Sequence, residues 1–209
     1  MIKVALLIDA GALREFARAV GRMFTADLVE DFACAAVADH EHLLRILFYD
    51  APLFEGTVTQ PVSGEEREFR GGSTVLDELA RRERFAVRRG TLAFRGWRPR
   101  PRPGESQPRY HFRDGEEPVD QDFDPVFVQK GVDMRIGLDI AAFAERRSVD
   151  RILLVTTDSD LVAAMKYGRR AGLEVGIVQL PRPMRSLSAP LLEHSDFVRE
   201  IPWRQADPA

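Results

Sequence analysis

The sequence predicts an α/β fold in which a mostly parallel sheet carries helices on both faces, with an irregular α+β insertion in the middle of the chain. Several short runs of Val, Ile and Leu lack the alternation of a half-exposed strand, which is typical of strands covered on both faces. These runs alternate with segments whose apolar residues recur at helical spacing, as in βαβ units. The length of 209 residues suits one domain that contains an insertion.

The first part of the chain predicts two strands separated by two helices. Thr25 is a suitable N-cap for the second helix, and Asp9 and Asp50 directly follow the two strands. The predicted strands are at 3–8 and 43–49, and the predicted helices at 13–20 and 25–39.

Residues 53–125 form the predicted insertion, because their pattern is less regular than the rest. A short helix is predicted at 74–84, followed by strand material at 85–97 with a turn near Gly90. The segment 98–108 is rich in Pro, Arg and Gly and is expected to be an exposed loop.

The last part of the chain returns to a clear alternation of strands and helices. Gly172 is expected to end one of the helices, and Pro181 to end the strand that follows it. The predicted strands are at 126–129, 152–155, 173–180 and, at the edge of the sheet, 197–201; the predicted helices are at 132–147, 159–171 and 188–194.

Acidic residues follow the predicted strands at the edge where ligands of open α/β sheets bind. Asp9 ends the first strand, Asp158 and Asp160 follow the strand at 152–155, and Asp133 begins the helix after the strand at 126–129. Several acids at one sheet edge would repel one another unless a cation lay between them. A set of oxygen ligands suits Mg²⁺ or Mn²⁺ better than zinc.

Asp139 falls inside the apolar stripe that Ile136, Ile140 and Phe143 form on the helix at 132–147. A buried carboxylate must be neutralised, hydrogen-bonded or bound to a cation. Asp139 is therefore a further candidate acid of the same site, with a hydrogen bond to neighbouring backbone as the alternative.

Each acid also has a purely structural interpretation. Asp158 or Ser159 is a possible helix N-cap, Asp133 a helix N-terminal acid favoured by the dipole, and Asp9 the start of a turn. It is the conjunction of the acids at one predicted sheet edge that favours a metal site.

Other classes of protein find less support in the sequence. No apolar run is long enough to span a bilayer, and the single cysteine, Cys34, excludes an intramolecular disulfide, so a cytoplasmic location is expected. Glycine-rich phosphate loops and a nucleophile elbow are absent. An aspartyl-phosphate phosphatase would need an acid at Gly11, and a Toprim-like site would need a glutamate after the first strand. The stretch Asp39-His40-Glu41-His42 resembles a set of metal ligands but lacks a third His or Cys partner, and it is expected to be a surface turn.

The chain resembles the NYN domains of the PIN-like nuclease superfamily, in particular a LabA-like bacterial group. The segments that carry the resemblance are 4–11, 44–52, 129–139 with its Lys-Gly-Val-Asp, 154–161 with its Asp-Ser-Asp, and 191–197. Two positions depart from the pattern: Ala12 replaces a frequent Asn, and Thr157 replaces a frequent Gly.

The resemblance implies a Rossmann-like sheet and Mg²⁺-dependent cleavage of phosphodiester bonds, usually in RNA. By position, Asp9, Asp133, Asp158 and Asp160 are expected to hold the metal, with Asp139 as a further catalytic acid. The predicted function is a metal-dependent ribonuclease. The alternative is a catalytically weak or inactive RNA-binding or regulatory module of the same fold, which Ala12 keeps open.

The substrate is expected to be single-stranded RNA, because basic and aromatic side chains are interleaved at 95–113. The alternative is a solvated Pro-rich loop whose aromatic side chains pack underneath it. A homodimer through the insertion is conceivable. The candidate substrate contacts are Lys130, Thr157, Arg98, Arg100 and Arg102.

Overall fold

The structure, a computed structural model, describes residues 1–100 and 117–202. It divides into two compact units, each described here by itself. Unit 1 comprises Met1–Asp50, Thr74–Gly90 and Gly131–Ala209, and unit 2 comprises Ala51–Ser73 and Thr91–Lys130.

Unit 1 is built on a six-stranded sheet in which every pair of neighbouring strands is parallel. The side chains of the central strand are buried from Val4 to Ile8, as expected for a strand covered on both faces. The predicted fold class is therefore confirmed. In spatial order the strands are β10 (Phe197–Glu200), β9 (Glu174–Gln179), β8 (Arg151–Val155), β1 (Ile2–Asp9), β2 (Glu41–Asp50) and β5 (Phe85–Arg89).

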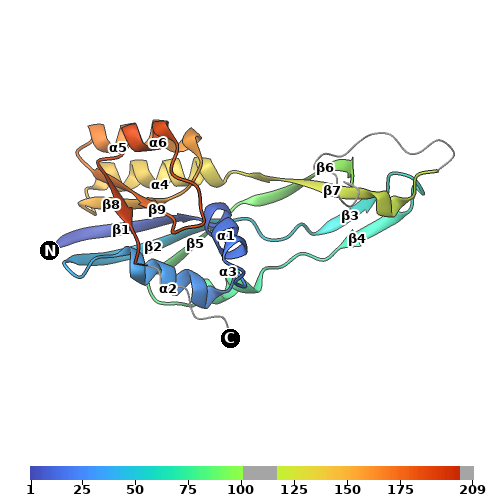
Figure 1. Ribbon diagram of the computed structural model, residues 1–209, viewed down its shortest axis with the longest axis horizontal. Coiled ribbons are helices and arrows are strands. Elements are labelled where there is room, and N and C mark those ends of the chain that lie inside the picture. The colour runs from blue at the N-terminus through green and yellow to red at the C-terminus, as the bar shows by residue number, and fades with distance from the viewer. Residues whose placement is uncertain (101–116, 203–209) are drawn as a thin grey trace. The chain divides into compact units, whose positions relative to one another are not determined.

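Helices cover both faces of this sheet (Figure 1). On one face lie α1 (Ala10–Ala19), α2 (Ala26–Ala36) and α3 (Thr74–Leu79), and on the other α4 (Val132–Arg146), α5 (Val162–Arg170) and α6 (Ala189–Glu193). Successive residues of β1 point to opposite faces, so Leu6 joins one apolar core with Phe16 and Leu7 joins the other with Ile136.

The first strand of the chain lies near the centre of the sheet, and later strands are added on either side of it. From β1 it moves outward to β2 and β5, then returns to β8 and moves outward the other way to β9 and β10. The direction reverses between the adjacent strands β1 and β8, where Ile8 lies beside Val155. Open α/β sheets bind ligands outside the carboxyl ends of the strands at such a reversal.

Unit 2 consists of two antiparallel ribbons and a cluster of phenylalanine rings. β3 (Gly56–Thr59) pairs with β4 (Glu66–Phe69), and β6 (Thr91–Pro99) pairs with β7 (Phe123–Lys130). The ring of Phe127 lies 5.2 Å from that of Phe54, 5.4 Å from that of Phe69 and 5.8 Å from that of Phe94. These rings give unit 2 a small aromatic core.

The insertion has different boundaries from the predicted 53–125. α3 and β5 lie within that range but belong to unit 1, since Leu76 and Leu79 are fully buried in its core and β5 pairs with β2. The strand predicted at 126–129 as part of the main sheet is β7, which instead pairs with β6 in unit 2. A short apolar pattern identifies a strand but does not identify its partner.

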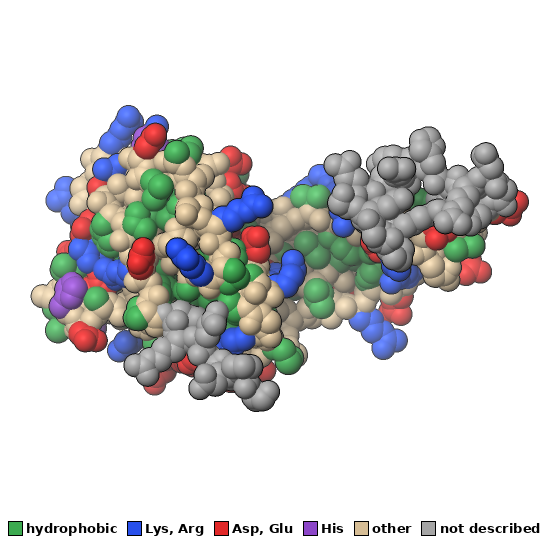
Figure 2. Space-filling model, viewed as in Figure 1, with side chains coloured by type: hydrophobic (Ala, Val, Ile, Leu, Met, Phe, Trp, Pro, Cys, Tyr) green, Lys and Arg blue, Asp and Glu red, His purple; other side chains and the backbone are tan. Residues whose placement is uncertain are grey.

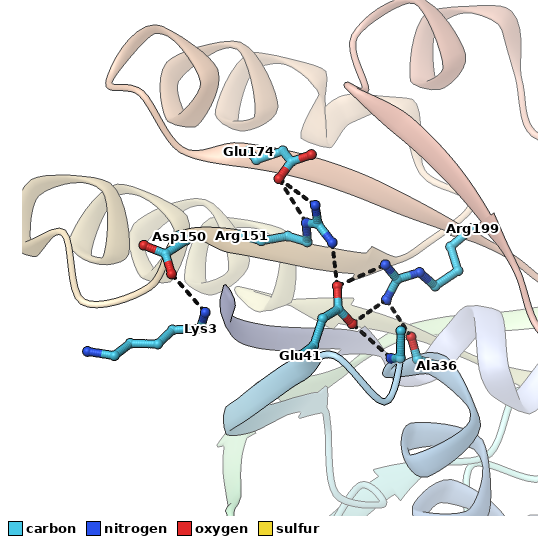
Figure 3. A network of polar contacts seen from close by, with 8 residues as sticks. Lys3, Ala36, Glu41, Asp150, Arg151, Glu174 and Arg199 are labelled. Atoms are coloured by element: carbon cyan, nitrogen blue, oxygen red, sulfur yellow. Dashed lines mark hydrogen bonds and ion pairs between the residues drawn. The ribbon is translucent and has the colours of Figure 1, made fainter. Parts of the chain in front are cut away.

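A buried ion-pair network joins the strands at the edge where β2, β8 and β9 begin (Figure 3). At its centre is Glu41, which accepts hydrogen bonds from Arg151 and Arg199 and from the backbone N–H of Ala38. Arg151 also pairs with Glu174 at 2.7 Å. The network lies at the opposite edge of the sheet from Asp9 and Asp158, which suits a structural role.

Within the described residues, no helix is both long and apolar enough to cross a bilayer.

Candidate functional site

Asp9 and Asp158 lie at the carboxyl ends of β1 and β8, at the reversal of strand order. Asp9 caps α1 by accepting a hydrogen bond of 2.9 Å from the backbone N–H of Gly11. In the same way, Asp158 accepts a hydrogen bond of 2.9 Å from the backbone N–H of Asp160 at the start of a 3-10 turn. The interpretation of Asp158 as a cap is therefore correct, and Asp9, for which the sequence suggested the start of a turn, is a cap as well. The caps fix both carboxylates at the place where this fold binds ligands.

Thr156 links these two acids. Its hydroxyl donates to Asp9 Oδ2 at 3.2 Å and accepts from the backbone N–H of Asp158 at 3.0 Å, while its residue is 1 % exposed. A buried hydroxyl with both roles satisfied holds its neighbours in one arrangement. Thr156 is thus a positioning residue for both acids.

Asp133 lies in the first turn of α4, directly after Gly131, whose φ of 76° lies in the left-handed region. Burial raises the pKa of Asp133, and the negative charges of Asp158 and Asp160 raise it further. The four acids therefore share one electrostatic environment, although only Asp9 and Asp158 come from the ends of adjacent strands.

The pKa of Asp9 is also raised, in the first place by burial. The hydrogen bonds from Gly11 and Thr156 lower it, and the charges of Asp133 and Asp158 raise it again. Since acids that raise one another's pKa repel when ionised, a cation would stabilise the group. The charges of nearby acids thus add to burial in raising the pKa of Asp9 and of Asp133.

The donors suit a hydrated ion better than a closed cage of protein ligands. Among residues 1–100 and 117–202, no three His, Cys, Asp or Glu side chains are arranged so that together they could hold a metal ion. Mg²⁺ usually binds through one or two carboxylates and keeps several waters. A metal ion at this edge would therefore be bound directly by one or two of these acids, and water molecules would supply its other ligands.

Asp139 has partners of its own. Its carboxylate accepts 2.9 Å hydrogen bonds from Tyr49 Oη and from Arg88 Nε, and Arg88 forms an ion pair with it. The prediction that this acid needs a counterion is met by a guanidinium. The structure thus gives Asp139 a different environment from that expected for a catalytic acid of the metal site.

Asparagine at position 139 is expected to lower the free energy of unfolding by about 1–2 kcal/mol, because it removes the charge that Arg88 and Tyr49 contact. The loss should be equal in EDTA and in Mg²⁺, as measured by urea unfolding in both buffers. Tyr49→Phe is the control, since it removes one donor only. If Asp139→Asn instead lost the stabilisation given by Mg²⁺, Asp139 would belong to the metal site.

A further acid at this edge was missed as a site candidate from the sequence. Asp50 ends β2, its side chain is 2 % exposed, and it pairs with Arg14 at 2.6 Å. Arg14 also lies over the ring of Phe24, 4.8 Å from its centroid. The available signal was the position of Asp50 directly after a strand, which is the signal that identified Asp9.

The predicted substrate contacts are distributed over both units. Thr157 is exposed in unit 1, while Lys130 and Arg98 are exposed at the end of β7 and on β6 in unit 2. Arg100 pairs with Asp124 at 2.9 Å, and Arg102 lies outside the described residues.

The described part of the segment 95–113 is mainly strand, since β6 extends to Pro99. Trp97 donates from Nε1 to the carbonyl of Thr59 at 2.8 Å and its ring contacts Phe94. At Trp97 the alternative of a packed aromatic side chain is therefore correct.

Basic and acidic side chains are interspersed over the described part of the face seen in Figure 2. This mixture agrees with the net charge of −3. On that face, attraction for a polyanion would have to come from local groups, since a broad basic surface is not visible there.

The sequence and the fold are both similar to those of known proteins. The family model of the NYN domain matches residues 72–197, a range that contains Asp133, Asp158 and Asp160. Among solved structures, a protein of unknown function from Vibrio parahaemolyticus matches with a TM-score of 0.53 and 18 % identity, over 96 % of this chain and 93 % of that chain. No curated protein matches. Because the family model covers more than half of the sequence, the chain belongs to the NYN domain family of the PIN-like nuclease superfamily.

Proposed function

We propose that this protein is a metal-dependent ribonuclease that hydrolyses phosphodiester bonds of single-stranded RNA. The observation that carries the proposal is the placement of Asp9 and Asp158 at the reversal of strand order, where backbone N–H groups and the hydroxyl of Thr156 hold both carboxylates. Membership of the NYN family, which suggests ribonuclease-type activity, supports the same conclusion. The residues proposed to hold a Mg²⁺ or Mn²⁺ ion are Asp9, Asp133, Asp158 and Asp160, one or two of them directly and the others through water molecules bound to the ion.

A bound divalent ion would lower the pKa of a water molecule and offset the charge that develops on the phosphate oxygens. The protein's own contribution is to hold the acids in place. The N–H groups of Gly11 and Asp160 fix the carboxylates of Asp9 and Asp158, and Thr156 connects the two. Preorganised oxygen donors do not have to reorient when the reaction begins. Asp139 stays outside the proposed ligand set.

RNA would be held by basic side chains that contact its backbone. Lys130 and Arg98 are exposed and suit this role, and Arg102 remains a prediction. Arg100 is engaged by Asp124, so its contact with RNA would have to compete with that ion pair. A homodimer also remains a prediction.

The second candidate function is an RNA-binding module of the same fold without turnover. The observation that favours it is Ala12, which is 2 % exposed within the apolar core of unit 1. At this position relatives often carry an asparagine, and a methyl group offers the site no polar contact.

A cleavage assay distinguishes the two functions. Labelled single-stranded RNA is incubated with the protein in Mg²⁺, Mn²⁺ or EDTA, and Asp158→Asn is compared with the wild type. The nuclease is expected to cleave with either metal, and EDTA and the substitution should each abolish cleavage. Asp31→Asn, which changes an exposed acid of α2, is the matched control. RNA that is retarded but intact would select the binding module.

A further inference from the structure

A pocket of about 380 Å³ in unit 1 reaches Thr157, the residue before Asp158 in the sequence. One wall is the segment between β9 and α6, from Pro183 to Ser188, and another is the last part of α1 with Glu15 and Ala19. Thr157 completes the lining. Since Thr157 directly precedes Asp158, the pocket opens next to a proposed metal ligand.

The wall formed by the segment 183–188 is anchored to the sheet. Gln179, the last residue of β9, donates from Nε2 to the carbonyls of Leu180 at 3.0 Å and Arg185 at 3.2 Å. Its Oε1 accepts from the N–H of Leu187 at 3.2 Å. Of the three hydrogen bonds of this amide side chain, two are to the segment 183–188, and they hold the wall in place before any ligand binds.

Two apolar side chains of the segment anchor it to both cores. Met184 packs against the core that contains Phe16, and Leu187 packs against the core that contains Ile136. The segment therefore spans the edge of the sheet and is held on both faces.

The lining combines apolar and polar groups in the way that a nucleoside requires. Met184 and Leu187 offer apolar contact for a planar base, while the hydroxyls of Ser186 and Thr157 can bond to a ribose or to the edge of a base. Glu15 and Arg185 both line the pocket, so their formal charges cancel and the lining gives a phosphate no net charge to bind. The volume lies within the range of small-ligand sites.

We infer that this pocket is a nucleoside subsite, which takes the base and ribose of the nucleotide adjoining the scissile phosphate of the RNA. The inference rests on the proposed function and names the part of the substrate that Thr157 and the segment 183–188 contact. With the base bound beside Asp158, the phosphate attached to that nucleotide is brought to the acids.

Photo-cross-linking of the wild-type protein tests the subsite. Short single-stranded RNAs carrying 4-thiouridine or 6-thioguanosine are irradiated with the protein in Mg²⁺, and the modified peptide is identified by mass spectrometry. The cross-link is expected within 183–188, where Met184 lines the pocket and has a polarizable sulfur. The experiment does not require an inactive variant, because a cross-linked nucleotide stays attached to its peptide even if the RNA is cleaved.

A substitution that fills the pocket gives an independent readout. Ser186 is exposed, so Ser186→Trp is expected to fold. Because the indole would occupy the volume that the base fills, KM for RNA should rise about tenfold, equivalent to about 1.4 kcal/mol, and the cross-link should decrease. Ser148→Trp places the same bulk in a different pocket and is expected to leave KM within twofold of the wild type.

The outcomes separate the subsite from the nuclease function. Cleavage by the wild type, with cross-links elsewhere and equal KM for the two tryptophan variants, overturns the subsite and leaves the nuclease intact. Failure of the wild type to bind or cleave RNA overturns both.

Discussion

Asparagine at position 133 is expected to reduce RNA cleavage by about 100-fold or more without destabilising the protein in metal-free buffer. A bound metal ion contributes several kcal/mol to the transition state, and each 1.4 kcal/mol or so is a factor of ten in rate. Asp133 is largely exposed, and its partial desolvation together with the charges of Asp158 and Asp160 raises its pKa. Removal of its charge therefore relieves repulsion in the folded state.

The sign of the stability change distinguishes this interpretation from a structural role for Asp133. An acid that only stabilises the start of α4 through the helix dipole would lose about 0.3–1 kcal/mol on neutralisation. A member of a repelling group should lose nothing, or gain. Urea unfolding in EDTA measures the difference directly.

The same experiment in Mg²⁺ completes the test. The wild type should gain stability with increasing Mg²⁺, as expected for an ion that binds only the folded protein, and Asp133→Asn should gain less. Asp31→Asn controls for the loss of one charge. An Asp133→Asn protein that cleaved RNA at the wild-type rate would remove Asp133 from the site.

The central part of unit 1 could be predicted because local pattern and burial agree there. β1 and β8 are short apolar runs without alternation, and their position in the sheet buries both faces. α4 has an apolar stripe at helical spacing and was predicted to within one residue. In these elements the spacing of apolar residues along the sequence both predicts the structure and accounts for its burial.

The partners of the outer strands could not be predicted in this way. β5 and β7 each contain a short run of apolar residues, yet β5 joins the main sheet and β7 joins β6. The choice depends on contacts between segments far apart in sequence, which periodicity does not contain. For this reason the predicted strand at 126–129 had the wrong partner.

In the candidate site, too, some features could be predicted from the sequence and others could not. Asp9 and Asp158 were found because the end of a parallel strand is a position that the sequence defines. The partners of Asp139 were not found, since Arg88 is 51 residues away in sequence and Tyr49 is 90 residues away. A buried acid in a helix predicts a counterion, but the sequence alone does not identify it.

Alanine at position 41 is expected to lower the free energy of unfolding by about 3–5 kcal/mol. Glu41 has a fully buried side chain and pairs with both Arg151 and Arg199 (Figure 3). Arg199 contacts it at 2.6 and 2.9 Å, and the N–H of Ala38 donates at 2.8 Å. Without Glu41, two guanidinium groups that are 12 % and 16 % exposed lose their shared counterion.

The structure offers a matched control on the same arginine. Glu174 also pairs with Arg151, but its side chain is 41 % exposed. Glu174→Ala should therefore cost at most about 1 kcal/mol. Urea unfolding of both variants at neutral pH gives the comparison, and equal losses would contradict a central role for Glu41.

The pH dependence of stability provides a second measure of the same network. Burial by itself raises the pKa of Glu41, but the hydrogen bonds from Arg199, Ala38 and Arg151 outweigh it and lower the pKa from 4.5 to about 2. Because the pKa is lower in the folded protein, the stabilisation is fully present above pH 4.5 and is lost as the pH falls towards 2. It amounts to about 3 kcal/mol.

Glu41→Gln isolates this contribution, since glutamine has no charge to titrate. The difference in unfolding free energy between the wild type and Glu41→Gln should be constant above pH 5 and shrink by about 3 kcal/mol between about pH 4.5 and 2. Acids whose pKa is raised, such as Asp9 and Asp133, titrate in both proteins and cancel in the difference. A difference that stayed constant down to pH 2 would mean that Glu41 is no better stabilised as an anion in the folded protein than in the unfolded chain.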